Sequence, residues 1–281
     1  MLQLPLNEKL VFYAVLAVYM LAGGVAVRQL AAGGEKYKRL LTALIALGVS
    51  LQSVMLIFRA VSLGAFPLTG LFESMIFLGI TFGLVYLFTS IVVSQIWFGS
   101  AMTWIMVLLV VLSAKVASPV AGKYESATTP WGIAHGLAMI LGGAMIAFST
   151  ASAWMYLLAN KRLKQKQIGK VLGRMPSVAK LQKMNVFGIE ACFVLVSFGL
   201  FVGLGLAAIE IRMDEKTWSQ WLIDPRTVLI CLAWLLLAVM LMLRFFARLG
   251  GRAIAYMTIV AFFLIIFATV GVVMFCGTIH D

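Results

Sequence analysis

The sequence predicts an all-α integral membrane protein, a bundle of about eight transmembrane helices. Of its 281 residues, 63% are apolar and only 11% are charged, a composition far from that of soluble domains. Apolar stretches of about 20 residues recur along the whole chain, and each is long enough to cross a hydrocarbon core as a helix. These stretches are too long and continuous for the alternating strands of a membrane barrel. A helical bundle is therefore the fold class that we expect.

The expected spans follow one another closely and leave no water-soluble domain over. They cover about residues 9–29, 39–60, 73–94, 101–117, 132–159, 186–209, 226–247 and 253–277. We therefore treat residues 1–281 as a single polytopic membrane domain. The first ten residues lack the basic start and short apolar stretch of a signal peptide, so we expect the first helix to be retained.

The positive charges indicate the orientation. Lysine and arginine gather in three connections, at residues 28–39, 161–183 and 244–252, and all three are cytoplasmic by the positive-inside rule. Both termini then lie on the outer side, together with the loops near 61–72, 118–131 and 210–225. Topology accounts for the net charge of +12, so we expect no nucleic-acid partner. The predicted location is the cytoplasmic (inner) membrane, crossed several times.

The basic stretch at residues 161–184 is too polar to span the bilayer. It contains eight lysines and arginines among apolar residues. One interpretation is a short amphipathic helix on the cytoplasmic surface, where basic side chains meet anionic headgroups. The other is a solvated basic loop.

The only two histidines of the chain are predicted at the outer membrane face. His135 begins the fifth span, just after Pro130 and Trp131, and His280 is the penultimate residue, beyond the eighth span. A single interfacial histidine is usually a hydrogen-bonded structural residue. Two histidines at matching depth on one face are a candidate pair of axial ligands for a metal or a haem iron.

Tryptophans stand in the outer loop between these histidines. Trp218 and Trp221 precede Asp224 there. They are typical of an aromatic belt, because indole favours the membrane interface. The alternative is a flat aromatic platform for a planar macrocycle, with Arg212 and Arg226 available to pair with its carboxylates.

A third candidate site is the outer loop at residues 64–74. Glu73 opens the third span, and Arg59 at the outer end of the second span could neutralise it. An acid at a helix N-terminus is also a favourable cap. The sequence contains no Walker loop, no Rossmann fingerprint, no nucleophile elbow and no H-E-x-x-H helix, so soluble-type catalysis has no support and we name no catalytic residue.

Four patches of this sequence resemble the CcsA-type (ResC) cytochrome c assembly family, including its HemX-like and YpjD-like branch. Residues 64–78 read G-A-F-P-L-T-G-L-F-E-S-M-I-F-L and are similar to the family's G-x-F-P-L-S-N-L-Y-E-S-L-x-F-L. Residues 130–135 resemble its P…W-x-x-x-H, and residues 175–185 its L-P-S-L-x-x-L-x-x-x-N. Trp221, Asp224, Pro225 and Trp234 fall in the place of its tryptophan-rich segment. His280 takes the place of a second external histidine. The likeness runs from about residue 55 to the end.

Two departures from the family pattern stand out. The tryptophan-rich segment is reduced, since Ile223 replaces a tryptophan and Trp218 is one place out of register. Met242 stands where haem-exporting members carry a histidine. Methionine can ligate haem iron, but beside Met240 and Met257 we expect Met242 to fill space in the core.

The resemblance implies a membrane protein of cytochrome c biogenesis (system II) that binds haem b at the outer face and delivers it to apocytochrome c, as a component of a haem lyase. It implies His135 and His280 as axial ligands, with Trp131, Trp218, Trp221 and Asp224 contributing to the haem site. The implied partners are a ResB/CcsB-like membrane protein and an apocytochrome with a C-x-x-C-H motif. The alternatives are a HemX-like regulatory or scaffold protein of haem synthesis, or a helical transporter with merely interfacial histidines.

Overall fold

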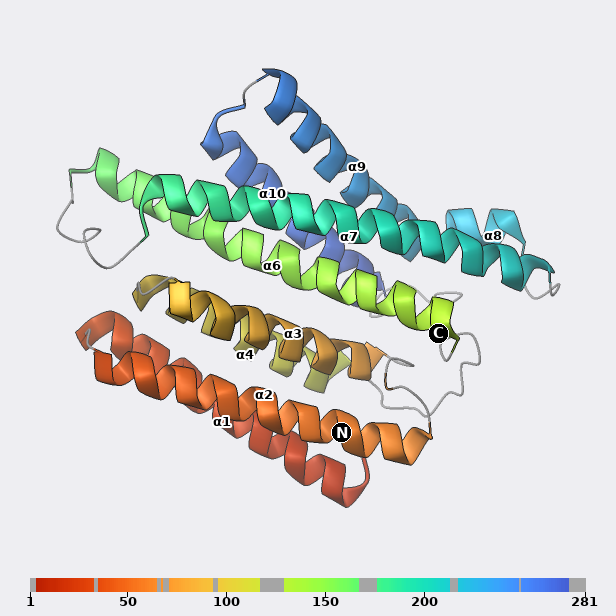
Figure 1. Cartoon of the computed structure of the whole chain (residues 1–281), viewed down its shortest axis with the longest axis horizontal. Helices are drawn as coiled ribbons and strands as arrows, with labels where there is room; N and C mark the ends of the chain where they lie inside the picture. The colour runs from red at the N-terminus through yellow and green to blue at the C-terminus, as the bar shows by residue number, and fades with distance from the viewer. Residues whose placement is uncertain are drawn as a thin grey trace. The chain divides into compact units, whose positions relative to one another are not determined.

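The computed structural model describes residues 4–32, 35–64, 67, 71–92, 96–116, 129–166, 176–212, 217–247 and 249–272. Within these residues the fold is entirely helical (Figure 1). The helices in chain order are α1 (Leu6–Ala32), α2 (Glu35–Leu63), α3 (Leu71–Val92), α4 (Ile96–Val116), α6 (Pro130–Lys164), α7 (Val178–Arg212), α8 (Trp218–Ile223), α9 (Pro225–Ala247), α10 (Gly251–Ile266) and the π-helical turn η2 (Phe267–Gly271).

The helices are long and apolar enough for a membrane protein, which confirms the predicted fold class. Seven of the described helices have the length and hydropathy of a membrane span, and the described apolar part of α4, Gly99–Ala114, is shorter. Within the described residues each predicted span overlaps one of these helices, the last of them continued by the turn η2. The orientation of the chain in the membrane stays a prediction.

Two of the helices extend well beyond their predicted spans. α6 runs on to Lys164 and α7 begins at Val178, so each has 35 residues and is about 52 Å long. The basic residues at 161–164 and 178–184 therefore belong to these two membrane helices. The prediction of a separate amphipathic helix over the whole of residues 161–184 was wrong. Residues 167–175 lie outside the described residues. The apolar runs alone did not reveal the continuation, because the turns beyond the predicted spans carry no such run.

The helices form two groups. The first contains residues 1–124 and 155–181, and the second contains residues 125–154 and 182–281. In the first group α1 packs against α2 and α4, α2 against α3, and α3 against α4 (Figure 1).

The core of the first group combines large side chains with glycines. The buried Tyr19 hydroxyl donates to Gln52 Oε1 at 2.9 Å, between α1 and α2. A Cβ added to Gly48 would lie 2.8 Å from the Tyr19 ring, and one added to Gly79 would lie 2.6 Å from Gln52 Nε2. Both glycines therefore make room for this pair, whose polar groups are buried and satisfy each other.

The second group is organised by α7. Ser149 of α6 donates to the carbonyl oxygen of Asn185 at 2.7 Å and to its side-chain oxygen at 2.6 Å, and Thr258 of α10 donates to the same side-chain oxygen at 3.1 Å. All three side chains are buried. Asn185, which belongs to the family-like patch, therefore joins α6, α7 and α10. Interhelical hydrogen bonds of this kind are a usual means of association where no hydrophobic effect operates between helices.

Met242 does not fill the core, contrary to the prediction. Its side chain on α9 is 62% exposed, whereas Met240 is buried. The two residues lie about 200° apart around the helix, because each residue turns an α-helix by about 100°. The cluster of methionines in the sequence therefore does not share one face of α9.

Candidate functional site

His135 lies on the second turn of α6, whose beginning is well determined by local sequence. Thr129 caps the helix, with its hydroxyl accepting from the Gly132 amide at 3.1 Å. Pro130 takes the first helical position, where the missing N–H costs nothing. Since helices rise about 1.5 Å per residue, His135 stands about 8 Å from the helix start. The prediction that His135 lies at the beginning of a span is thus confirmed.

The imidazole of His135 is held against α7. Its Nδ1 lies 2.7 Å from the carbonyl oxygen of Gly199, and the side chain is partly buried. His135 of α6 contacts Gly199 of α7, and Ser149, later in α6, contacts Asn185, which comes earlier in α7. The two helices are therefore antiparallel neighbours in this region. The beginning of α6 and the end of α7 therefore lie at the same end of the second group (Figure 1).

Two glycines one helical turn apart make the contact with His135. Gly199 and Gly203 form a G-x-x-x-G pattern on α7. A Cβ at Gly203 would lie 3.0 Å from His135 Cε1. Sequence analysis did not connect this pattern to the histidine. The signal was nevertheless present, because glycines at this spacing commonly mark a close helix contact in membranes.

Two of the three tryptophans of the candidate site are exposed, and Trp221 is half-buried. Trp131, on the first turn of α6, is exposed, and so is Trp218 on α8. α8 is a short helix with a capping box, in which the Gln220 side chain accepts from the Thr217 amide at 3.0 Å while Thr217 caps the Gln220 amide. Figure 1 shows α8 at the same end of the second group as the beginning of α6.

The rings of Trp218 and Trp221 do not form a flat platform. Their centroids are 6.4 Å apart and the planes meet at 85°. In this conformation only one of the two rings can stack on a given planar ligand, and the other can meet it with an edge. The predicted flat aromatic platform was therefore wrong in geometry. Residues three apart lie on the same face of a helix, but the rotamer of each side chain sets the plane of its ring independently.

Asp224 and Arg226 occupy the corner between α8 and α9. The buried Asp224 carboxylate accepts from the Thr227 amide at 3.4 Å, and Pro225 begins α9, so Asp224 has the position of a helix cap. Arg226 Nε is buried and has no hydrogen-bonding partner within the described part of the chain. Nε of this cation can therefore still donate a hydrogen bond at the corner.

His280 lies outside the described residues. Its pairing with His135 therefore stays a prediction. In the described ranges there is no group of three or more His, Cys, Asp or Glu side chains that could hold a metal ion. A metal in this part of the chain would need a ligand set of another kind, such as the single imidazole of His135.

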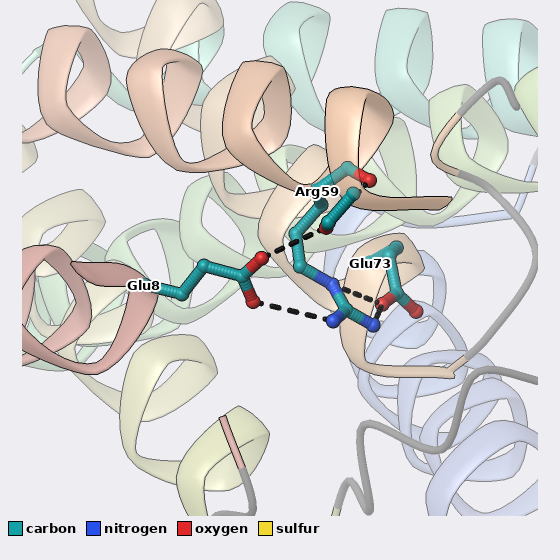
Figure 2. A network of polar contacts seen from close by, with 4 residues as sticks. Glu8, Arg59 and Glu73 are labelled. Atoms are coloured by element: carbon teal, nitrogen blue, oxygen red, sulfur yellow. Dashed lines mark hydrogen bonds and ion pairs between the residues drawn. The ribbon is translucent and has the colours of Figure 1, made fainter. Parts of the chain in front are cut away.

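A second polar site lies in the first group, where Arg59 joins two carboxylates (Figure 2). Arg59 Nε donates to Glu73 Oε1 at 2.8 Å, and Nη2 of the same guanidinium also contacts Glu73. Its Nη1 lies 3.2 Å from Glu8 Oε2. Ser62 donates to the other oxygen of Glu8 at 2.9 Å. These side chains come from the ends of α1, α2 and α3.

The predicted pairing of Arg59 with Glu73 is confirmed, and Glu8 is an addition. Glu8, Arg59 and Glu73 are 3%, 5% and 2% exposed, so the cluster is shielded from solvent. Sequence analysis had noted the arginine and one acid but had not used Glu8. Glu8 could have been found from its predicted position at the outer end of the first span, on the same side of the membrane as Arg59 and Glu73.

The long apolar helices, with polar sites at their ends, define a multi-pass helical membrane protein. A family model described as "Cytochrome C assembly protein" matches residues 68–280. The match covers most of the chain, so the protein belongs to this family and has a role in cytochrome c biogenesis. A search of curated proteins and a search of solved structures each found no match. Glu8 and Arg59 precede the matched segment and are joined to it through Glu73.

Proposed function

We propose that this protein holds haem b at the outer face of the cytoplasmic membrane and presents it to an apocytochrome c. His135 and His280 serve as the axial ligands. Family membership supports the pathway, and the arrangement of His135 carries the proposal for the site. Its Nδ1 is engaged with Gly199, so Nε2 is the nitrogen left for an iron ion.

The described residues fit a haem in their chemistry. An imidazole nitrogen is the usual axial ligand of haem iron in many proteins. Arg226 has a buried Nε without a partner in the described part of the chain, and a guanidinium is suited to pair with a propionate. The exposed rings of Trp131 and Trp218 offer apolar contact area near the helix ends.

Each side chain has a distinct task in this proposal. His135 orients the macrocycle and Arg226 binds a carboxylate at its edge. Asp224 caps α9 and so keeps the corner with Arg226 and Trp221 in place. Bound haem supplies the vinyl groups to which the two cysteine thiols of a C-x-x-C-H motif add as thioethers. A ResB/CcsB-like membrane protein is the proposed partner in delivery.

The visible absorption spectrum of the purified protein tests the proposal. We expect a Soret band in the wild-type protein, either as isolated or after addition of haemin, that is lost or shifted in the double variant His135→Ala/His280→Ala. Met242→Leu is the matched control. Because Met242 is largely exposed on α9, its replacement should leave the band unchanged.

A colourless wild-type protein that also takes up no added haemin would overturn the proposal. A Soret band that survives unchanged in the double-histidine variant would equally overturn the assignment of the ligands. In the first case the HemX-like regulatory or scaffold role would become the leading interpretation.

A further inference from the structure

We infer that Gly199 and Gly203 of α7 position His135, holding the imidazole as the Nδ1–H tautomer with Nε2 presented for ligation. Gly199 contributes its carbonyl oxygen, and Gly203 contributes the space in which the ring lies. The inference rests on the proposed function for the identity of the ligand, but not for the state of the imidazole. Both glycines act through His135 and are positioning residues.

The tautomer follows from the hydrogen bond. A backbone carbonyl oxygen can only accept, so at 2.7 Å from Gly199 O the Nδ1 atom has to carry the proton. In a neutral imidazole Nε2 then carries the lone pair. Within the described residues Nε2 has no hydrogen-bonding partner. This is the arrangement found at many metal-binding histidines, where the second nitrogen is fixed by a carbonyl or carboxylate.

The orientation of the ring follows from the distances to Gly203. A Cβ at that position would lie 3.0 Å from Cε1, 3.1 Å from Nδ1 and 4.0 Å from Nε2. The edge between Nδ1 and Cε1 is thus the one that packs on α7, and Nε2 is directed away from it. Because 3.0 Å is closer than carbon atoms normally approach, a methyl group at Gly203 would displace the ring.

Gly199 and Gly203 have different neighbours, so substitutions at the two positions have different effects on His135. A Cβ at Gly199 would meet Met139, 2.7 Å from its sulfur atom, and not the imidazole. At Gly205, on the same helix, a Cβ would meet nothing within 4 Å. Gly203→Ala therefore perturbs His135 directly, and Gly205→Ala is its matched control with the same chemical change.

The state of the imidazole is testable without haem. In a His280→Ala protein carrying no histidine tag, His135 is the only histidine, and ¹⁵N-histidine labelling gives one pair of ring nitrogens. Long-range proton–nitrogen correlation distinguishes the tautomers, because Nε2 couples to both ring carbon-bound protons whereas Nδ1 couples strongly only to the one on Cε1. We expect the protonated nitrogen to be Nδ1. A protonated Nε2 with a bare Nδ1 would overturn the inference.

The contribution of Gly203 is tested by haem titration, monitored by the Soret band in detergent. We expect Gly203→Ala to bind haemin about 10–100-fold more weakly than Gly205→Ala, the usual effect of removing the support of a metal-binding histidine. The electron paramagnetic resonance spectrum of the ferric complex should shift as well, because it reports the orientation of the axial imidazole. Equal affinities and equal spectra in the two variants would overturn the positioning role.

The two tests distinguish a failure of this inference from a failure of the proposed function. If wild-type protein binds no haemin, the proposed function fails, while the nitrogen correlations still decide the tautomer. Loss of the Nδ1–H signature in Gly203→Ala, with helix content equal to that of Gly205→Ala by circular dichroism, would then support the positioning role by itself. Retention of the signature in Gly203→Ala would refute it.

Discussion

Replacing Arg59 by methionine is expected to destabilise the protein strongly. The substitution keeps most of the volume of the side chain but removes the cation that joins Glu8 and Glu73 (Figure 2). Both carboxylates are nearly inaccessible, at 3% and 2% exposure, so water cannot replace the guanidinium. Breaking a buried ion pair by removing one partner costs about 3–5 kcal/mol. We expect a loss of this size in the free energy of unfolding.

The measurement is reversible unfolding in mixed micelles with increasing dodecyl sulfate, monitored by circular dichroism. Arg212→Met is the matched control, since Arg212 is exposed at the end of α7 and its loss should change the free energy by less than about 0.5 kcal/mol. The triple variant Arg59→Met/Glu8→Gln/Glu73→Gln should recover much of the stability, because it leaves no charge uncompensated.

Two results would refute this reasoning. One is a loss below about 1 kcal/mol in Arg59→Met, which would mean that the carboxylates tolerate the removal of their counterion. The other is a triple variant no more stable than the single variant, which would mean that the arginine acts through packing of its stem and not through its charge.

Two further substitutions test the packing of the second group. Asn185→Ala should cost only about 1 kcal/mol in the same unfolding assay, the size of an average interhelical hydrogen bond in a membrane protein. Both partner hydroxyls keep a backbone acceptor, the carbonyl oxygen of residue 185 for Ser149 and that of Ile254 for Thr258, and a loss above about 3 kcal/mol would contradict this view. Gly188→Ala should cost about 1–3 kcal/mol, because the new Cβ would lie 3.0 Å from a carbonyl oxygen of α6 that cannot move aside easily. Gly24→Ala, whose Cβ would meet nothing within 4 Å, should be unchanged or slightly more stable, and equal losses at both glycines would show that the close contact does not matter.

The sequence was a reliable guide to the positions of the long apolar helices and to the family. The apolar spans predicted the long helices because length and hydropathy are local properties. The caps at Thr129 and Asp224, which the sequence analysis did not predict, also depend on neighbouring residues alone, each with a proline in the first helical position. The motif around Glu73 indicated the family that the match over residues 68–280 established.

Where prediction went wrong, the missing information was the direction of side chains, in the plane of a ring or around the helix axis. Trp218 and Trp221 are close in sequence, but their rings meet at 85°. Met242 and Met240 are closer still, and only one of them is buried. In a membrane helix that is apolar on nearly all sides, composition does not mark the inner face as it does in a soluble protein.

By itself the sequence determined that this protein is a multi-pass helical membrane protein of the cytochrome c assembly family, and it singled out His135, Arg59 and Glu73 as polar residues at helix ends. It also predicted the pairing of Arg59 with Glu73. Only the tertiary structure decided the other partners. Glu8 meets Arg59 across 51 positions of the chain, and Gly199 meets His135 across 64. Such pairs depend on which helices are neighbours and on how far each is shifted along the other, and these are properties of packing between helices.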